Sequence, residues 1–208
     1  MKNGNKTYNV KTIDSSQNDW RKNAIEAKVD NFPWASDDDY RPETSAWLAT
    51  DGVSLFIYME TNETDLRALT TGLGYVHTDS CMEFFVCPDP ASSQKYLNFE
   101  LNPIGAMHLA IGTCRKDRVT LPIENYKELF NVKTGTNAKG WNLEFRIPLS
   151  FLREFFPSMK LKSGHVMRGN FYKCGDNTPK PHYGCWSPID LPKPDFHNSD
   201  FFSELVLE

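Results

Sequence analysis

Polar and apolar side chains alternate along four segments, and the polar members carry groups that bind hydroxyls. Residues 98–102, 142–147 and 167–172 alternate strictly, and residues 81–86 alternate less regularly. Successive side chains of a strand point to opposite faces, so the pattern predicts half-buried strands. If these strands share a sheet, its outer face gathers Glu83, Asn98, Glu100, Asn102, Glu144, Arg146, Arg168, Asn170 and Tyr172. Such a face suits a neutral, hydroxyl-rich ligand, and an ordinary solvated sheet face is the alternative.

The glutamates of this face raise the question of catalysis. Glycoside hydrolysis needs two carboxylates about 5–10 Å apart, one of them with a raised pKa. Glu83, Glu100 and Glu144 could lie on adjacent strands, but an open, solvated face would not desolvate them. The sequence also lacks a G-x-S-x-G elbow, an H-E-x-x-H motif and a P-loop. We therefore predict a non-catalytic protein, with a glycoside hydrolase as a minor alternative.

Three sets of residues could bind metal, one of them zinc and the other two calcium. Cys174, His182 and Cys185 lie close together in sequence and could hold zinc, although no fourth ligand is evident. A disulfide between Cys174 and Cys185 is the alternative. Calcium, which needs six to eight oxygen ligands, is an optional cofactor. Its candidate ligands are Asp37, Asp38 and Asp39, or Asp65 with Asp79, and a solvated acidic loop is the alternative reading of residues 37–39.

Composition excludes several kinds of partner. The net charge of −4 and the lack of a Lys/Arg-rich run argue against nucleic acid. No apolar stretch approaches the roughly 20 residues that cross a bilayer. Residues 1–6 lack the apolar run of a secretory signal, which predicts a cytoplasmic protein unless a leader was removed. The sequence leaves the oligomeric state open.

The elements that must position these residues are mostly short strands. We expect them near residues 8–13, 44–49, 54–61, 81–87, 95–102, 106–113, 118–121 and 166–174, with another ending at Pro148 and a last one at 202–207. A short helix should span residues 148–156, since Pro148 suits an early helical position and Pro157 stops the helix. A helical turn is expected at 65–69. Many short strands without long helices predict an all-β antiparallel β-sandwich of Greek-key or jelly-roll type with one or two short helices. Residues 1–208 should form a single domain, with residues 1–30 as an N-terminal extension packed on it.

Five stretches in order resemble the family 9 carbohydrate-binding modules of xylanase type and their bacterial relatives. They are residues 51–57 (DGVSLFI) leading into Asp65, residues 79–85 (DSCMEFF), residues 140–148 (GWNLEFRIP), residues 168–172 (RGNFY) with 185–188 (CWSP), and the closing residues 194–207, with Ser203 where glycine is usual. The resemblance covers about residues 30–208.

The resemblance implies a Greek-key β-sandwich that binds plant-polysaccharide sugars of the xylan or cellulose type, takes part in carbohydrate catabolism and has structural calcium in some members. Sugar-binding members clamp a terminal sugar between two tryptophans. This chain has residues 75–78 (YVHT) and 190–196 at those places, without a tryptophan. The family's strand glutamate is kept as Glu83, and Glu100 stands where some members place an arginine.

The predicted ligand site combines ring stacking with hydrogen bonds. Tyr75, His77, Trp186 or Phe196 would stack on the sugar, and its hydroxyls would bind Glu83, Asn98, Glu100, Asn102, Arg168 and Asn170. Two alternatives stay open. One is a structural or partner-binding sandwich that has lost its sugar site. The other is haem ligation, as in dopamine-hydroxylase-like sandwiches, by a Met–His pair drawn from Met59, His77, Met82, Met107 and His108.

Overall fold

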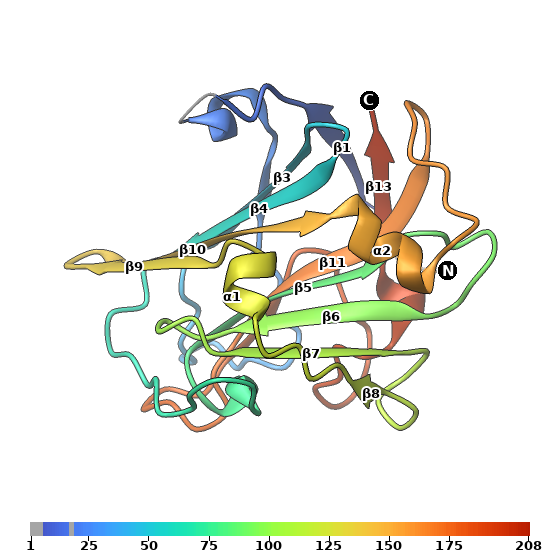
Figure 1. Cartoon of the computed structure of the whole chain (residues 1–208). Coiled ribbons are helices and arrows are strands. Elements are labelled where there is room, and N and C mark those ends of the chain that lie inside the picture. The colour runs from blue at the N-terminus through green and yellow to red at the C-terminus, as the bar shows by residue number, and fades with distance from the viewer. Residues whose placement is uncertain (1–5, 17–18) are drawn as a thin grey trace.

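Strands dominate the computed structural model, which describes residues 6–16 and 19–208 (Figure 1). The strands are β1 (Thr7–Thr12), β2 (Glu26–Lys28), β3 (Thr44–Thr50), β4 (Ser54–Thr61), β5 (Cys81–Cys87), β6 (Tyr96–Leu101), β7 (Met107–Gly112), β8 (Val119–Thr120), β9 (Lys133–Asn137), β10 (Gly140–Pro148), β11 (Val166–Cys174), β12 (Tyr183–Cys185) and β13 (Ser203–Leu207). The helices are α1 (Tyr126–Leu129) and α2 (Leu149–Phe155), with 3-10 turns at Trp20–Asn23, Val76–Thr78 and Ser199–Phe201. Neither α-helix in the described part of the chain has the length and apolar character to span a membrane. The first five residues of the predicted N-terminal extension lie outside the described residues.

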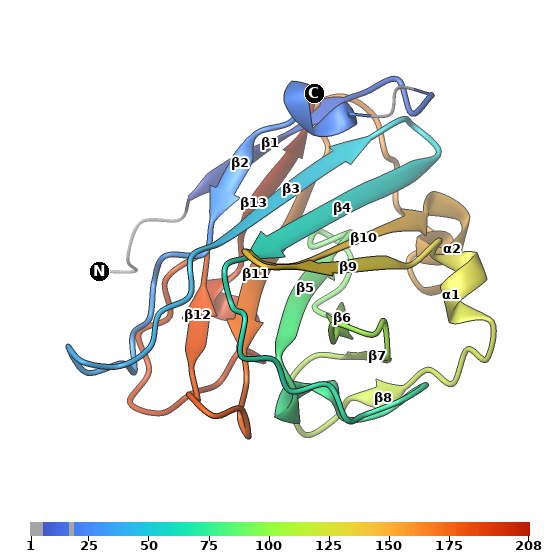
Figure 2. The same cartoon turned by 90° about the vertical axis from the view of Figure 1, so that its left-hand side faces the viewer.

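The strands form two layers joined by β1 (Figure 2). One layer has the order β8-β7-β6-β5-β11-β13, with β12 beside β11, and the other has the order β3-β4-β10-β9, with β2 beside β3. Residues 7–10 of β1 pair with β13, and residues 11–12 pair with β3. Strand β1 runs parallel to both of these neighbours. The predicted β-sandwich is confirmed, but its sheet is mixed and not purely antiparallel.

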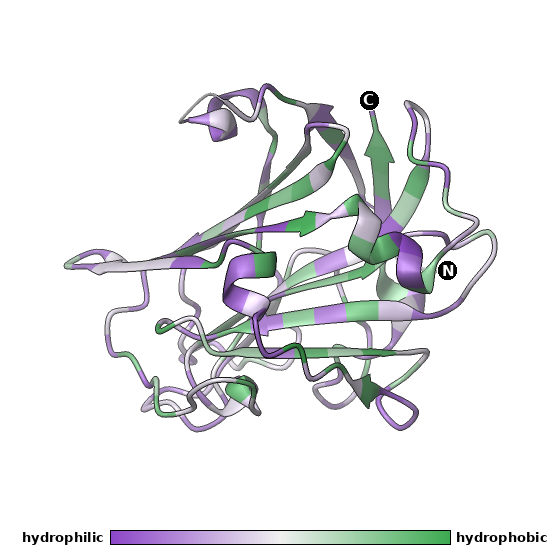
Figure 3. Ribbon diagram, in the orientation of Figure 1, coloured by the Kyte–Doolittle hydropathy of each residue, from purple (hydrophilic) through white to green (hydrophobic). Residues whose placement is uncertain are grey.

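Apolar side chains of the two layers meet in the main core. Met82, Phe84 and Val86 of β5 alternate with outward residues, and Trp141 and Phe145 of β10 face them from the other layer. The same alternation is visible along β6 and β10 in Figure 3. The two helices lie on one side of the molecule and contribute further apolar side chains to this core (Figure 2).

The predicted helix after Pro148 is confirmed, and the predicted helical turn at residues 65–69 is wrong. Helix α2 begins at Leu149, directly after Pro148, and ends at Phe155, before Pro157. At residues 67–69 the backbone donors bind another segment instead. The Arg67 N–H donates to Ser80 Oγ, and the Leu69 N–H donates to Asp79 Oδ2. These long-range hydrogen bonds replace those that a helical turn would form.

A second core covers the outer face of the β5–β6–β11 layer. Every residue of β5 and β6 is buried, because the chain at 186–202 crosses this face. Ile189, Phe196 and Phe202 pack on outward rings of the layer, and the rings of Phe196 and Tyr172 stack with centroids 4.2 Å apart. The predicted solvated face is therefore wrong for this layer. It holds for the other layer, where Arg146 is exposed and Lys133 forms an ion pair with the half-buried Glu144.

Candidate functional site

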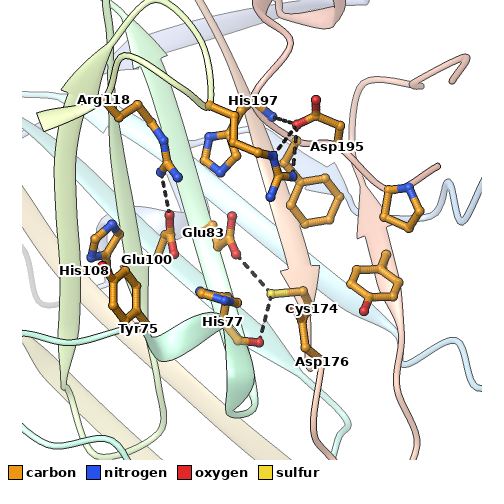
Figure 4. Close-up of a pocket in the computed structure, with 14 residues that line it drawn as sticks. Tyr75, His77, Glu83, Glu100, His108, Arg118, Cys174, Asp176, Asp195 and His197 are labelled. Carbon is orange, nitrogen blue, oxygen red and sulfur yellow. Dashed lines mark hydrogen bonds and ion pairs between the residues drawn. The ribbon is translucent and has the colours of Figure 1, made fainter. Parts of the chain in front are cut away.

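A pocket of about 220 Å³ opens on the outer face of the first layer (Figure 4). Glu83 and Glu100 form its floor, and Tyr75 with its histidine neighbours forms one wall. The opposite wall is the segment around Asp195, on the far side of the two glutamates from Tyr75. The pocket is smaller than the 300–1,000 Å³ typical of sites for drug-sized ligands. Its size suits one ring of a sugar.

Strand register brings the floor residues together. Glu83 of β5 lies opposite Glu100 of β6, and Glu100 lies opposite His108 of β7. Directly opposed residues of antiparallel strands project to the same face about 4.5–5.5 Å apart. Asn98 stands one step along β6 and donates from Nδ2 to Glu100 Oε1 at 2.8 Å. The floor is thus a row of polar side chains held on three rigid strands.

Burial changes the protonation of the two floor glutamates. It raises the pKa of Glu83 to about 7. The pKa of Glu100 is raised well above its usual value by burial and by the neighbouring Glu83, and Arg118 Nη1, 3.5 Å from Glu100 Oε1, does not outweigh them. Both carboxyls are therefore easier to protonate than ordinary glutamates, and a protonated carboxyl donates a hydrogen bond as well as accepting one. The expectation that these acids are not desolvated is wrong, because the 186–202 segment covers the face.

Aromatic rings stand beside this floor. Tyr75 is 69% exposed, and its ring centroid lies 5.4 Å from that of His108 and 6.0 Å from that of His77. Burial lowers the pKa of His108 to about 4, so its imidazole is neutral at physiological pH. Phe196 and Tyr183 line the pocket as well, with ring centroids 6.4 Å apart. The pocket therefore combines ring faces with a hydrogen-bonding floor.

Two arginines complete the rim. Arg115 is paired with Asp195, with Nη2 3.0 Å from Oδ1. Arg118 is mostly buried, and its Nε and Nη1 make no hydrogen bond within the described residues. These N–H groups lie next to Glu100 and face the pocket (Figure 4). Nη1 is held beside Glu100 by their ion pair, and Nε is a buried N–H group without a hydrogen-bond partner.

Of the residues predicted to bind a ligand, Tyr75, His77, Glu83, Glu100 and Phe196 line the pocket, and Asn98 supports Glu100. The other four lie elsewhere. Asn170 exchanges two hydrogen bonds with the backbone of Ser187. Arg168 donates to the Phe202 carbonyl, and Trp186 is 5% exposed in the main core, against Tyr8 and Phe171. Asn102 holds the turn before β7, where its Oδ1 accepts the Ala106 N–H.

The lining residues missed by sequence reasoning are Arg115, Arg118, Asp176, Pro194, Asp195 and His197. Most come from loops. His108 was considered only as a haem ligand, and Cys174 only as a zinc ligand or disulfide partner. Arg118 had a usable signal, because the adjacent predicted strands at 106–113 and 118–121 suggest a hairpin that returns this residue to the sheet. Asp176 had none, since only long-range packing brings it to the face. The family resemblance had already placed residues 190–196 at the sugar clamp.

The calcium candidates do not converge. Asp37 and Asp39 lie in an exposed loop, where Asp39 accepts the Ser36 N–H. Asp79 is fully buried, and its Oδ2 accepts hydrogen bonds from the Leu69 and Thr70 N–H groups and from Asn102 Nδ2. Its Oδ1 faces Arg67 Nε at 3.4 Å. Donors surround this carboxylate, whereas a calcium ion needs oxygens around it. The residues present therefore do not fit calcium.

Asp79 instead ties the 67–70 segment to β6, and its replacement should destabilise the protein. We expect Asp79→Asn to lower the free energy of unfolding by about 2 kcal/mol, because an amide cannot accept all three bonds. Urea denaturation measures the change. Asp65→Asn, an exposed acid of the same segment, is the control and should stay within about 0.5 kcal/mol of the parent. Equal stability of both variants would contradict the role of Asp79.

Cys174, His182 and Cys185 do not converge on a zinc site, and Cys174 and Cys185 do not form the proposed disulfide. Cys174 faces outward on β11, whereas the His182 Nε2 accepts a hydrogen bond from the inward Lys173 at 2.7 Å. All five cysteines lie in the described part of the chain and are free. The haem alternative fails for a similar reason. Met59, Met82 and Met107 belong to the main core, but His77 and His108 line the outer pocket, so the sheet separates them.

Comparison with known proteins gives one family and several similar structures. The family model for carbohydrate-binding family 9 matches residues 16–207. A crystal structure of a proposed carbohydrate-binding protein from Bacteroides uniformis is 29% identical, and the alignment covers 99% of this chain and 100% of that one with a TM-score of 0.82. Two structures of a family 9 module from Caldicellulosiruptor kristjanssonii share the fold. The protein in the complex with cellotriose is 16% identical, the alignment covers 98% of this chain and 94% of that one, and the TM-score is 0.67. For the complex with glucose, the identity is 17%, the alignment covers 98% of this chain and 96% of that one, and the TM-score is 0.65. No curated protein matches the sequence.

Proposed function

The chain belongs to carbohydrate-binding family 9, and on this basis we propose that its outer-face pocket binds one end of a plant polysaccharide of the xylan or cellulose type. The observation that carries the proposal is the exposed ring of Tyr75 beside the buried Glu83–Glu100 pair. A sugar presents an apolar face that a ring can cover, and hydroxyls that both donate and accept. The pocket offers a partner for each.

The charge of the pocket favours a neutral ligand. Asp195 balances Arg115 at the rim, and burial and the neighbouring Glu83 raise the pKa of Glu100, which favours the neutral form of that carboxyl. Arg118 adds N–H groups that make no hydrogen bond to the described residues, with Nη1 in an ion pair 3.5 Å from Glu100. The rings of Tyr75 and Phe196 replace the two tryptophans of the family's sugar clamp. Burying the apolar face of a sugar against an aromatic ring is favourable, and hydrogen bonds to Arg118 are charge-assisted.

We propose binding without catalysis. The carboxyls of a glycosidase flank the scissile bond and act from two sides of it. Glu83 and Glu100 instead project from adjacent strands on one side, as the floor of the pocket. A sugar above them would meet both from the same direction, and Asp195 on the opposite wall is held in an ion pair with Arg115.

Calorimetric titration with xylobiose, cellobiose, xylose and glucose tests the proposal. We expect saturable binding with a Kd in the micromolar to millimolar range for at least one disaccharide. Each titration should be repeated with calcium and with a chelator, and equal affinity is expected because the candidate aspartates do not converge. A folded protein that binds none of the four sugars would overturn the proposed ligand class.

A further inference from the structure

Three metal-ligating side chains meet at the floor of the pocket, where Glu83 and Cys174 line it and Cys81 lies buried beside them. Cys81 and Glu83 come from β5, and Cys174 comes from β11. Their sulfur and carboxylate oxygen atoms all lie within 4.8 Å of one another, and all three side chains are buried. In residues 6–16 and 19–208, no other group of three or more cysteine, histidine or acidic side chains meets this condition. The glutamate pair and the aromatic wall do not explain this cluster.

Strand register fixes the positions of the three ligands. Cys81 and Glu83 are two residues apart on one strand, so their side chains share the outer face. Cys174 lies directly opposite Cys81 in the antiparallel β5–β11 pair. Because all three stand on paired strands, the cluster does not depend on a loop.

The distances fit one small ion. The Glu83 Oε1 lies 3.0 Å from Cys174 Sγ and 3.8 Å from Cys81 Sγ. Tetrahedral zinc, with Zn–S near 2.3 Å and Zn–O near 2.0–2.2 Å, places its ligand atoms roughly 3.6–3.8 Å apart. The 3.8 Å separation matches, and the 3.0 Å separation requires Cys174 and Glu83 to move apart by about 0.6–0.8 Å.

We propose that the pocket floor binds one zinc ion through Cys81, Glu83 and Cys174, with the fourth position directed into the pocket. Thiolate ligands select zinc over calcium and magnesium, which prefer oxygen. Each thiol releases its proton on binding, so two thiolates and one carboxylate bring three negative charges against two on the ion. Cys174 lines the pocket and gives the ion a route to the site (Figure 4). Three protein ligands with an open fourth position leave room for a water or a ligand hydroxyl.

Metal titration of the full chain tests this proposal without any sugar. The protein is reduced with a phosphine, freed of metal with a chelator, and titrated with Zn²⁺ against a chromophoric chelator. Cd²⁺ is titrated in parallel, and its thiolate charge-transfer absorption reports sulfur ligation. We expect one ion per chain, the cadmium band, and a rise in Tm with Zn²⁺ because the ion binds the folded state. Ca²⁺ should produce none of these changes.

Variants assign the ion to its ligands. Cys81→Ser and Cys174→Ser should each weaken Zn²⁺ binding by at least about 100-fold. Losing a residue that only hydrogen-bonds to a metal ligand already costs about 10–100-fold in metal affinity, and these substitutions remove a ligand itself. Cys87→Ser is the matched control, since Cys87 is also on β5 and buried but lies outside the cluster. Cys114→Ser removes the exposed thiol. Thermal melts without metal confirm that each variant folds.

Three results would overturn the site: no stoichiometric Zn²⁺ binding by the parent, binding that survives both cluster substitutions, or binding that disappears with Cys114→Ser. Because no sugar is present, failure of the sugar titration leaves this result untouched. Conversely, a protein that binds sugar but no zinc retains its proposed function and loses only the metal site.

Discussion

Replacing Glu63 with glutamine should lower the free energy of unfolding by about 4 kcal/mol at neutral pH, the cost typical of a buried charge that loses its partner. The partner is Lys173, which is fully buried and has its Nζ 2.9 Å from Glu63 Oε2. Burial opposes ionisation of Glu63, but Lys173 and Trp141 outweigh it, so the pKa of this carboxyl is lowered. Glutamine would leave the ammonium without a counter-charge.

The neighbours of Lys173 cannot replace Glu63. Its Nζ donates to His182 Nε2 at 2.7 Å and to the Cys174 carbonyl at 2.9 Å. His182 Nε2 must therefore accept, and Nδ1 donates to the Lys180 carbonyl. Burial and Lys173 lower the pKa of His182 to about 4, so it is neutral and supplies no negative charge.

A double-mutant cycle measured by urea denaturation separates the pair from its parts. Glu63→Gln and Lys173→Met should each destabilise strongly, and the double variant should lose less than the sum because no buried charge is left unpaired. Glu60→Gln is the matched control, an exposed glutamate on β4 that should change little. If the two losses in free energy of unfolding were additive, or if Glu63→Gln cost less than about 1 kcal/mol, the Glu63–Lys173 pair would not stabilise the fold.

Replacing Tyr75 with alanine should weaken sugar binding about 30-fold, or about 2 kcal/mol, as expected for an aromatic hot spot. Tyr75 is 69% exposed, so the substitution removes little buried surface, and the Tm should stay close to that of the parent. Calorimetry with the best-binding disaccharide of the panel measures the affinity.

Two further variants make this result specific. Tyr75→Phe keeps the ring and should retain most of the affinity, because stacking requires the ring face and not the hydroxyl. Val53→Ala, at a side chain that is 70% exposed and does not line the pocket, should bind like the parent. Unchanged affinity in Tyr75→Ala would remove this ring from the site and leave Phe196 as the stacking candidate.

The sequence by itself determined the local elements and their order. Alternation with a period of two set the faces of β5, β6, β10 and β11, because it follows from strand geometry alone. Pro148 and Pro157 set the limits of α2, since proline acts on the backbone at its own position. The succession of short motifs, from 51–57 to 194–207, indicated the family that the family model shows.

Only the tertiary structure decided the environment of the site. The alternation at Glu83 and Glu100 is the same whether the outer face meets water or protein. The 186–202 segment, roughly 100 residues along the chain, buries that face and so raises both pKa values. The same packing brings Asp195 and Phe196 to the pocket. The pairing of β5 with β11 places Cys174 against Cys81. Local patterns record which way a side chain points, but its solvation depends on segments distant in sequence, and solvation determines its chemistry.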